Sequence, residues 1–195
     1  MKIIKGGILV NPVASFASDV AVEDGLIARV DRAIAPGPED EVIDARDCLV
    51  FPGFIDAHTH FDMNNGVTTT ADDFATGTAA AVAGGTTTIV DFATQDRGGT
   101  LSDALALWHV KAEGRCSCHY AFHMAITDWN ERTRGELREM VNAGVTSFKL
   151  YMAYDALRVG DAQLYEALRA LRQLGGIAGV HCENGDLVNH LIARE

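Results

Sequence analysis

The sequence lacks the long apolar segments that place proteins in or across membranes. No run of about 18 apolar residues occurs, which is the length that a membrane-spanning helix needs. Lys2 and Lys5 make the first residues basic, but the apolar core of a secretory signal does not follow them. The sequence therefore predicts a protein with no membrane partner and no signal peptide.

Cysteine and basic residues are also scarce, and each shortage excludes a class of protein. The four cysteines form no spaced framework, and Cys116 and Cys118 are too close for an ordinary disulfide or a zinc knuckle. This favours a reducing, cytoplasmic location. The 16 basic residues face 27 acidic ones, giving a net charge of −11, and no basic patch emerges that could neutralise nucleic-acid phosphates. We therefore expect no nucleic-acid partner.

The apolar content, 48% of 195 residues, is enough for one sizeable core and a small second lobe. Residues 1–51 alternate short apolar runs with turn residues, which predicts β structure. The clearest hairpin is Ser18–Val30, with Asp24-Gly25 as its turn. A sheet that no helix covers is incomplete, so we interpret residues 1–51 as the N-terminal part of a β-sandwich domain.

From residue 52 to residue 195 the pattern changes to alternating strands and helices. Thr70–Asp73 and Thr133–Glu136 predict helix starts, and Leu164, Leu168 and Leu171 predict the buried face of a later helix. Such a succession implies parallel strands joined by right-handed crossovers. The five expected strands are Phe54–Ala57, Thr86–Phe92, Tyr120–Ile126, Val145–Leu150 and Ile177–His181.

A doubly wound sheet and a (β/α)8 barrel both fit five consecutive β/α units. No Gly-x-Gly-x-x-Gly follows the first strand, which weakens the dinucleotide-binding version. In a barrel the chemistry lies where strands end. Because residues i and i+2 of a strand share a face, His58 and His60 can approach one metal ion together. With Lys149 and His181 near two other strand ends, the pattern predicts a metal site on one rim of the barrel.

Five stretches of sequence carry a family resemblance. Phe51–His60 resembles the first-strand motif of the amidohydrolase superfamily. Thr70–Phe74, Gly84–Phe92, Ser147–Tyr154 and Val180–Gly185 are similar to the hydantoinase/dihydropyrimidinase family. The resemblance runs over nearly the whole chain. It implies an α/β fold, a partial (β/α)8 TIM barrel over residues 52–195 with about five of its eight units. It also implies an enzyme that opens a small cyclic amide, a hydantoin or 5,6-dihydropyrimidine, to the N-carbamoyl amino acid.

The resemblance further implies a centre of two divalent metal ions, most often zinc. His58 and His60 would bind the more buried ion, and His181 would bind the second. Lys149, carboxylated by carbon dioxide, would bridge both ions as a carbamate. Tyr154, five residues later, would hydrogen-bond the developing oxyanion of the substrate. An ordinary tyrosine packed on the barrel rim is the alternative for Tyr154.

The loop after the paired histidines is implied to shape the pocket for the exocyclic group of the substrate. Met63, Asn64 and Asn65 lie in this loop. The two asparagines depart from the family pattern, which often has Pro and a bulky apolar residue there. This predicts a more polar pocket or altered stereoselectivity. A flexible loop without such a role is the alternative.

The remaining histidines do not end strands on the rim, and we expect none of them to bind the metal. Cys182 follows His181 and points to the opposite face of its strand, so we expect it to be a small buried hydrophobe. The histidines in question are His109, His119, His123 and His190.

The implied mechanism needs a further histidine and a proton-transferring aspartate from later strands, and the sequence ends at Glu195 without them. A complete barrel takes about 250 residues. We therefore expect residues 1–195 to be the N-terminal portion of a longer enzyme, commonly a homotetramer in this family. We expect this portion alone to be inactive and poorly soluble, since five strands cannot close a barrel.

Two other functions are open from the sequence. An allantoinase resembles this site and also uses the bridging lysine. A non-catalytic scaffold relative, or a remnant, would have lost metal ligands, whereas all four predicted ligands are present here. A dihydroorotase is disfavoured, because an arginine usually follows the paired histidines by two residues there and this chain has Asp62.

Overall fold

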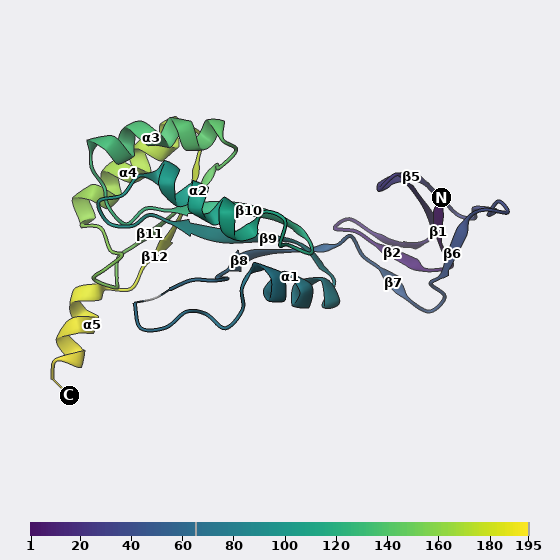
Figure 1. Cartoon of the computed structure of the whole chain (residues 1–195). Helices are drawn as coiled ribbons and strands as arrows, with labels where there is room; N and C mark the ends of the chain where they lie inside the picture. Colours follow the sequence, from purple (N-terminus) through teal and green to yellow (C-terminus); the bar gives the residue numbers. More distant parts are fainter. Residues whose placement is uncertain (65, 195) are drawn as a thin grey trace. The chain divides into compact units, whose positions relative to one another are not determined.

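The computed structural model describes residues 1–64 and 66–194, and the chain divides into two units, Met1–Phe54 and Ile55–Glu195. Short strands make up the first unit, and strand–helix repeats make up the second (Figure 1). Within the described ranges, no helix is long and apolar enough to cross a membrane.

The first unit is built from β1 (Lys2–Lys5), β2 (Ile8–Val10), β3 (Ser15–Ala17), β4 (Asp19–Glu23), β5 (Leu26–Asp31), β6 (Glu41–Asp44) and β7 (Leu49–Val50). They form two sheets with the strand orders β5-β4-β1-β6 and β3-β2-β7. The predicted hairpin is confirmed, because β4 and β5 pair antiparallel on either side of Asp24 and Gly25, which both have positive φ. The buried cluster of this unit consists of Ile3, Ala21 and Ile34.

The sheet that organises the second unit contains β8 (Phe54–Thr59), β9 (Thr86–Thr94), β10 (His119–Ala125), β11 (Ser147–Tyr151) and β12 (Ile177–His181). Its strand order is β12-β11-β10-β9-β8, so each strand lies beside its neighbour in sequence. The pairings β9–β10, β10–β11 and β11–β12 are parallel, and the sheet curls into part of a barrel. The prediction of an α/β fold with a partial (β/α)8 barrel is confirmed.

The helices of the second unit are α1 (Phe74–Ala83), α2 (Leu101–Ala112), α3 (Glu131–Asn142), α4 (Asp161–Gln173) and α5 (Gly185–Ile192). Helices α2, α3 and α4 lie along one face of the sheet (Figure 1). Two predicted helix starts are wrong by a few residues. Asp73, and not Thr70, caps α1, while Asn130 caps α3 and so places Thr133 inside its first turn. Short polar side chains can cap from several neighbouring positions, and the spacing alone does not choose among them.

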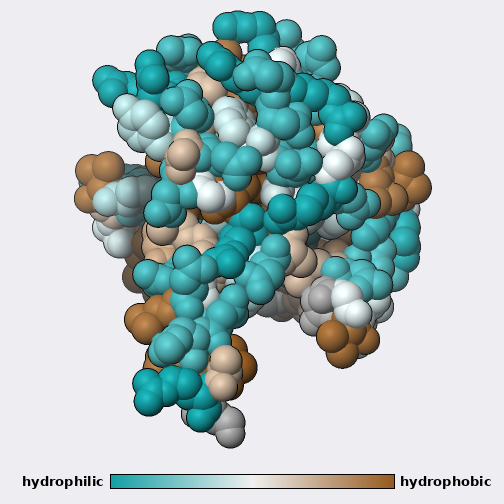
Figure 2. All heavy atoms as spheres, turned by 90° about the vertical axis from the view of Figure 1, so that its left-hand side faces the viewer, coloured by the Kyte–Doolittle hydropathy of each residue, from teal (hydrophilic) through white to brown (hydrophobic). Residues whose placement is uncertain are grey.

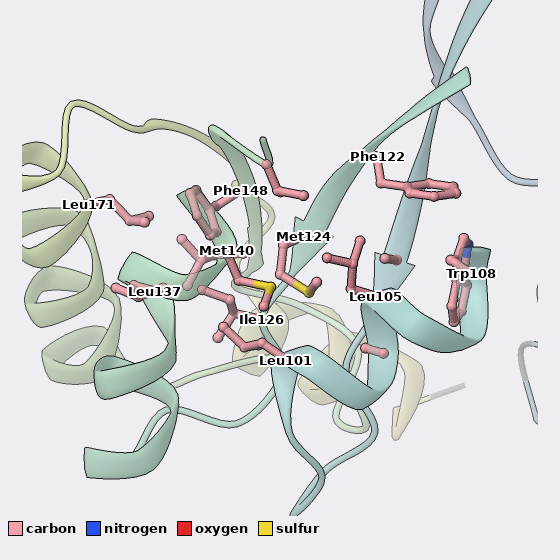
Figure 3. Packing of buried hydrophobic residues seen from close by; sticks show 14 of the residues in the cluster. Leu101, Leu105, Trp108, Phe122, Met124, Ile126, Leu137, Met140, Phe148 and Leu171 are labelled. Carbon is pink, nitrogen blue, oxygen red and sulfur yellow. The ribbon is translucent and has the colours of Figure 1, made fainter. Parts of the chain in front are cut away.

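The core of the second unit lies between this sheet and its helices (Figure 3). Leu101, Leu105 and Trp108 of α2 contribute to it, as do Leu137 and Met140 of α3. These side chains pack with apolar residues of β10 and β11. The apolar face of α2 is therefore turned toward the sheet.

Helix α4 buries a narrower face than its leucines predict. Leu171 is buried, but Leu164 is only half-buried and Leu168 is 37% exposed. The prediction that Leu168 is buried is wrong, because the buried face of α4 centres on Ala167 and Leu171, one helical turn apart.

The last strand and the last helix leave apolar side chains uncovered. Leu187, Leu191 and Ile192 of α5 are exposed, and so is Ile177 of β12. Figure 2 shows brown side chains beside teal ones at the bottom of the view, where α5 lies. In the part of the chain that the structure describes, no strand pairs with the outer edge of β12. A closed barrel would pair such an edge.

Candidate metal centre

The paired histidines come from the end of β8. His58 lies in the strand and His60 one residue beyond it, and their Nε2 atoms are 3.2 Å apart. Two imidazole nitrogens bound at about 2.0–2.1 Å to one tetrahedral zinc ion would lie about 3.3 Å apart. The two side chains therefore have a separation at which a single cation can contact both.

Phe92 of β9 supports both imidazole rings. Its ring centroid lies 4.7 Å from that of His58 and 4.9 Å from that of His60. Phe92 itself is buried. An apolar ring at this distance restricts the rotamers of both histidines and keeps water from one side of them.

The surroundings of His60 favour the neutral imidazole. Burial lowers the pKa of His60, Asp91 opposes this effect, and His58 and Lys149 lower the pKa further. The Nδ1 atom of His60 is buried and has no hydrogen-bond partner. Because the neutral ring is the form that binds metals, the site holds His60 in the charge state that metal binding requires.

Lys149 extends from β11 between two aromatic rings. Its Nζ atom lies 6.0 Å from the centroid of Phe92 and 5.4 Å from the centroid of Tyr151. The side chain is half-buried, and among the described residues no carboxylate forms an ion pair with it. Lys149 thus lies beside the ring that supports the histidine pair and has no counter-ion of its own.

His181 ends β12, the strand next to that of Lys149. Its Nε2 atom is buried and lacks a hydrogen-bond partner, although Glu183 Oε2 lies 2.9 Å away at ion-pair distance. The His181 ring lies 6.2 Å from Tyr151 and 5.0 Å from Tyr154, measured between centroids. Contacts therefore run in series from Phe92 through Lys149 and Tyr151 to His181.

Tyr154 lies in the loop after β11, in a conformation that its neighbours hold. Its φ is 67°, a region that non-glycine residues seldom adopt, and its carbonyl accepts hydrogen bonds from the backbone N–H groups of Leu157 and Arg158. The Arg97 guanidinium donates to the Asp155 carbonyl at 3.3 Å and to the Arg158 carbonyl at 3.1 Å. The Tyr154 side chain is 55% exposed, so its hydroxyl is free to meet a ligand.

The loop predicted to shape a substrate pocket is closed by its own hydrogen bonds. The Met63 N–H donates to Thr70 Oγ1 at 3.0 Å, and the Thr70 N–H returns a bond of 3.0 Å to the Met63 carbonyl. Asn64 Oδ1 accepts from the Gly66 N–H at 2.7 Å. Asn65 lies outside the described residues. The Asn64 oxygen thus holds the turn, and its amide N–H groups have no acceptor among the described residues.

Two residues outside the predicted ligand set have clear places. Both ring nitrogens of His123 have partners, the Ser147 hydroxyl and the Ala57 carbonyl, so this histidine has no nitrogen to offer a metal. Cys182 is exposed, and the prediction that it is buried is wrong. The reason is its place just after β12, the edge strand, where no further element covers it.

The four predicted ligands form a partial set. In residues 1–64 and 66–194, no group of three or more His, Cys, Asp or Glu side chains is placed to hold a metal ion. The structure brings His58 and His60 together and places Lys149 beside them, while His181 is connected through Tyr151. The unpartnered Nε2 of His181 fits a metal site, because a bound cation would give this buried nitrogen the partner it lacks. At His60 the 3.2 Å separation of its Nε2 from that of His58 is the observation that fits a cation.

Asp91 is a residue of this region that the sequence did not single out. It is 1% exposed and accepts hydrogen bonds from Thr59 Oγ1, Trp108 Nε1 and the backbone N–H groups of Phe61 and Phe92. The available signal was an acidic residue inside the apolar, β-branched run of β9. A charge there needs partners when it is buried.

Comparison with known proteins places this geometry in a family. The sequence model of the amidohydrolase family matches residues 49–193. The chain is 43% identical over 192 residues to a D-hydantoinase of Geobacillus stearothermophilus. It is 44% identical over 188 residues to a dihydropyrimidinase of Dictyostelium discoideum. A solved D-hydantoinase structure, from a Bacillus sp. AR9, matches with a TM-score of 0.94 at 40% identity.

These matches cover most of this chain but less than half of each relative. The two sequence alignments cover 97% and 95% of this chain, and 41% and 37% of the relatives. The structural match covers 100% of this chain and 42% of the other. The chain therefore spans about two fifths of the length of the relatives that it matches.

Proposed function

The chain belongs to the amidohydrolase family, and on that premise we propose that the complete protein containing it is a cyclic amidohydrolase. Its reaction adds water across a ring amide of a hydantoin or a 5,6-dihydropyrimidine, breaks the ring C–N bond and yields the N-carbamoyl amino acid. The supporting observation is the convergence of His58 and His60, 3.2 Å apart at Nε2, beside Lys149. Similarity to proteins named D-hydantoinase and dihydropyrimidinase supports this substrate class.

The donor set suits two divalent cations, and zinc in particular accepts imidazole and carboxylate donors. His58 and His60 would hold one cation and His181 the other. Lys149 would join them once its neutral amine has reacted with carbon dioxide. In that step an N–C bond forms, one proton leaves, and the side chain gains a carboxylate. When bound, the cations would supply Lewis acidity and lower the pKa of water at the site.

The other residues of the site act on the substrate. The Tyr154 hydroxyl, exposed beside His181, would donate a hydrogen bond to the oxygen that becomes negative as water adds to the carbonyl. Met63, Asn64 and Asn65 would line the pocket for the exocyclic substituent. The amide N–H groups of Asn64 have no acceptor among the described residues and would favour a polar substituent there. Phe92 would exclude water beneath the histidines.

The proposal is tested by removing the carboxylate that Lys149 would carry. In the complete protein, Lys149→Ala should reduce ring opening of dihydrouracil and hydantoin more than about 100-fold, since even residues that only support a ligand cost about 10- to 100-fold. The N-carbamoyl products are measured by chromatography after metal removal and after reloading with zinc. Added acetate should restore part of the activity of Lys149→Ala, because it supplies the missing carboxylate.

His190→Ala is the matched control, since His190 is exposed on α5 and outside the proposed ligand set. It should retain activity.

Ring opening that persists after complete metal removal, or an unchanged rate in Lys149→Ala, would contradict the proposal. Tyr154→Phe should lower kcat by about 100-fold or more while leaving the unfolding midpoint in place.

Allantoin belongs in the same substrate panel, because an allantoinase is the second candidate function. Allantoin is a hydantoin with a polar ureido substituent, and the polar Asn64 in the proposed pocket is the observation that favours it. Turnover of allantoin with no turnover of dihydrouracil would replace the first candidate by the second. Both share the proposed ligands, so the Lys149→Ala result applies to either reaction.

The setting of the complete protein is also a proposal. We propose a cytoplasmic homo-oligomer, with the four cysteines unpaired as they are in this structure. Burial raises the pKa of Cys116 to about 11, so its thiol stays protonated and unreactive at neutral pH. Light scattering and cell fractionation would test the assembly and the location separately.

A further inference from the structure

Asp91 is a fully buried carboxylate within the barrel sheet. It lies on β9, is 1% exposed and has no cationic partner among the described residues. Four neutral donors satisfy its two oxygens instead. Burying a carboxylate is unfavourable unless it is well hydrogen-bonded, so this arrangement calls for a specific role.

The donors to one Asp91 oxygen flank His60 on both sides. Oδ2 accepts from Thr59 Oγ1 at 2.9 Å and from the Phe61 N–H at 2.8 Å. These are the residues directly before and after His60. A single oxygen therefore holds the Thr59 side chain and the Phe61 backbone, on the two sides of a predicted metal ligand.

The donors to the other oxygen connect the same carboxylate to the support of the site. Oδ1 accepts from the Phe92 N–H at 2.8 Å and from Trp108 Nε1 at 3.1 Å. The Phe92 ring is the one on which His58 and His60 rest. Trp108 is buried on α2 and anchors the carboxylate from the helix layer (Figure 3).

Two further contacts hold the segment after His60. Lys111 Nζ donates to the Asp62 carbonyl at 2.7 Å and lies 4.3 Å from the centroid of the Trp108 ring. The Phe61 ring packs on α1, where a Cβ added at Gly77 would lie 2.3 Å from Phe61 Cε1. The chain around His60 is thus held from β9, α1 and α2 together.

We propose that Asp91 is the positioning residue of the metal centre, fixing through Thr59 and Phe61 the direction in which His60 presents its imidazole to a cation. The proposal rests on the proposed metal-dependent function and deepens it. Asp91 makes no direct contact with the metal or the substrate. It acts because a carboxylate can accept from all four donors at once, which no other side chain of this size can do.

An asparagine cannot replace it, for a reason that the geometry makes specific. Each side-chain oxygen of Asp91 faces two donors, so either orientation of an amide would set its NH2 group against two of them. Asp91→Asn keeps the volume and replaces one acceptor oxygen by an NH2 donor. Thr59→Val is gentler, because it removes one donor to Oδ2 next to His60 and leaves the carboxylate in place.

The test measures cobalt binding to the metal-free protein, with Co2+ as the probe and its visible absorption as the readout. Asp91→Asn and Thr59→Val should each weaken Co2+ affinity by about 10- to 100-fold, the usual range for groups that orient a ligand. Their spectra should also change, since the arrangement of donors around the ion changes. Thr59→Ser, which keeps the hydroxyl, should restore the affinity.

Thr133→Val is the matched control, since Thr133 is a buried threonine whose hydroxyl donates to the Asp128 carbonyl at 2.9 Å, away from the proposed ligands. Thr133→Val should lower the urea unfolding midpoint about as much as Thr59→Val does. It should keep the Co2+ affinity and the spectrum of the unsubstituted protein. Equal affinities in Thr59→Val, Thr133→Val and the unsubstituted protein would overturn the positioning role alone. Absence of any Co2+ binding by the unsubstituted protein would overturn the proposed function together with this inference.

Discussion

The two units of the chain each bury an aspartate, and they satisfy the two carboxylates differently. In the first unit Asp19 accepts hydrogen bonds from Lys5 Nζ and from the backbone N–H groups of Gly6 and Ile34. In the second unit Asp91 has neutral donors alone. One carboxylate is part of an ion pair that links three segments of a small unit. The other has no cationic partner among the described residues and is hydrogen-bonded to the residues on both sides of His60.

The sizes of the two apolar cores explain why Asp19 contributes to stability while Asp91 is free to serve the candidate metal centre. Among the described residues, the cluster in the first unit has three buried members and the cluster in the second has nineteen. A small cluster contributes little burial free energy, so the first unit depends more on its polar contacts. The second unit has the larger apolar core and buries a carboxylate without an ion pair. The comparison predicts that the stability of the second unit is most sensitive to substitutions of apolar side chains. The stability of the first unit should be most sensitive to substitutions of polar ones.

The largest effect should come from a large core side chain of the second unit. Phe148 is 2% exposed, and Phe148→Ala should destabilise this unit by about 3–5 kcal/mol, through lost burial and the cavity left behind. Both tryptophans, Trp108 and Trp129, lie in this unit, so their fluorescence during urea unfolding reports on it alone. Amide exchange in β1 and β4 should stay unchanged. Loss of protection there would show that the two units unfold as one.

The next effect should come from Asp19 in the first unit. Asp19→Ala leaves the N–H groups of Gly6 and Ile34 without their acceptor, which should destabilise the unit by about 1–3 kcal/mol. Hydrogen exchange should show lost protection at these two amides, while tryptophan fluorescence of the second unit stays the same. An equal shift of the urea midpoint measured by tryptophan fluorescence would show that Asp19 also stabilises the second unit, against this prediction.

A smaller effect should follow from acidification. Hydrogen bonds from Ile34 and Gly6, then the Lys5 ammonium, lower the pKa of Asp19 from its usual 3.8 to about 2. A carboxyl whose folded pKa is depressed stabilises the fold above its unfolded pKa, and this contribution is lost as the pH falls from about 4 to about 2. Methyl NMR signals of Ile3 should therefore weaken in that window, and Asp19→Asn should remove the dependence. A Lys5→Met variant that keeps the same pKa for Asp19 would assign the shift to the backbone bonds.

The smallest effect should come from the outer face of α4. Leu168→Gln should change the stability of the second unit by no more than about 0.5 kcal/mol, since Leu168 is 37% exposed. Leu171→Ala on the same helix should cost about 2–5 kcal/mol, because Leu171 is 1% exposed. The difference between the urea midpoints of these two variants measures how far the exposed and buried faces of α4 differ in their contribution to stability. Equal shifts would mean that α4 is covered on both faces in solution.

Local patterns were enough to predict the order of strands and helices. Apolar periodicity and turn residues fixed the β/α succession, and the hairpin around Asp24-Gly25 followed from its dipeptide. The place of His58 and His60 at a strand end followed from the same reasoning. These features depend on residues close together in the sequence. That is why they could be read without the structure.

Features that depend on distant neighbours could not be read in this way. The burial of Leu168 and Cys182 depends on which elements lie next to α4 and β12, and both predictions were wrong for that reason. Asp91 was missed because three of its four donors come from residues 30 and 32 positions earlier and 17 positions later. A lone acid in a strand has the same sequence pattern whether it faces water or four donors.

Gly77 has a consequence for how this protein tolerates change. The residue lies in α1, on the helix face against Phe61, and any side chain there would collide with that ring. The Phe61 ring would have to shift, and Phe61 directly follows His60 in the chain. A survey of random substitutions scored by metal content should therefore find position 77 nearly as intolerant as a ligand, although it touches none. Mutational sensitivity in this protein would thus extend through packing to a helix that carries no functional group of its own.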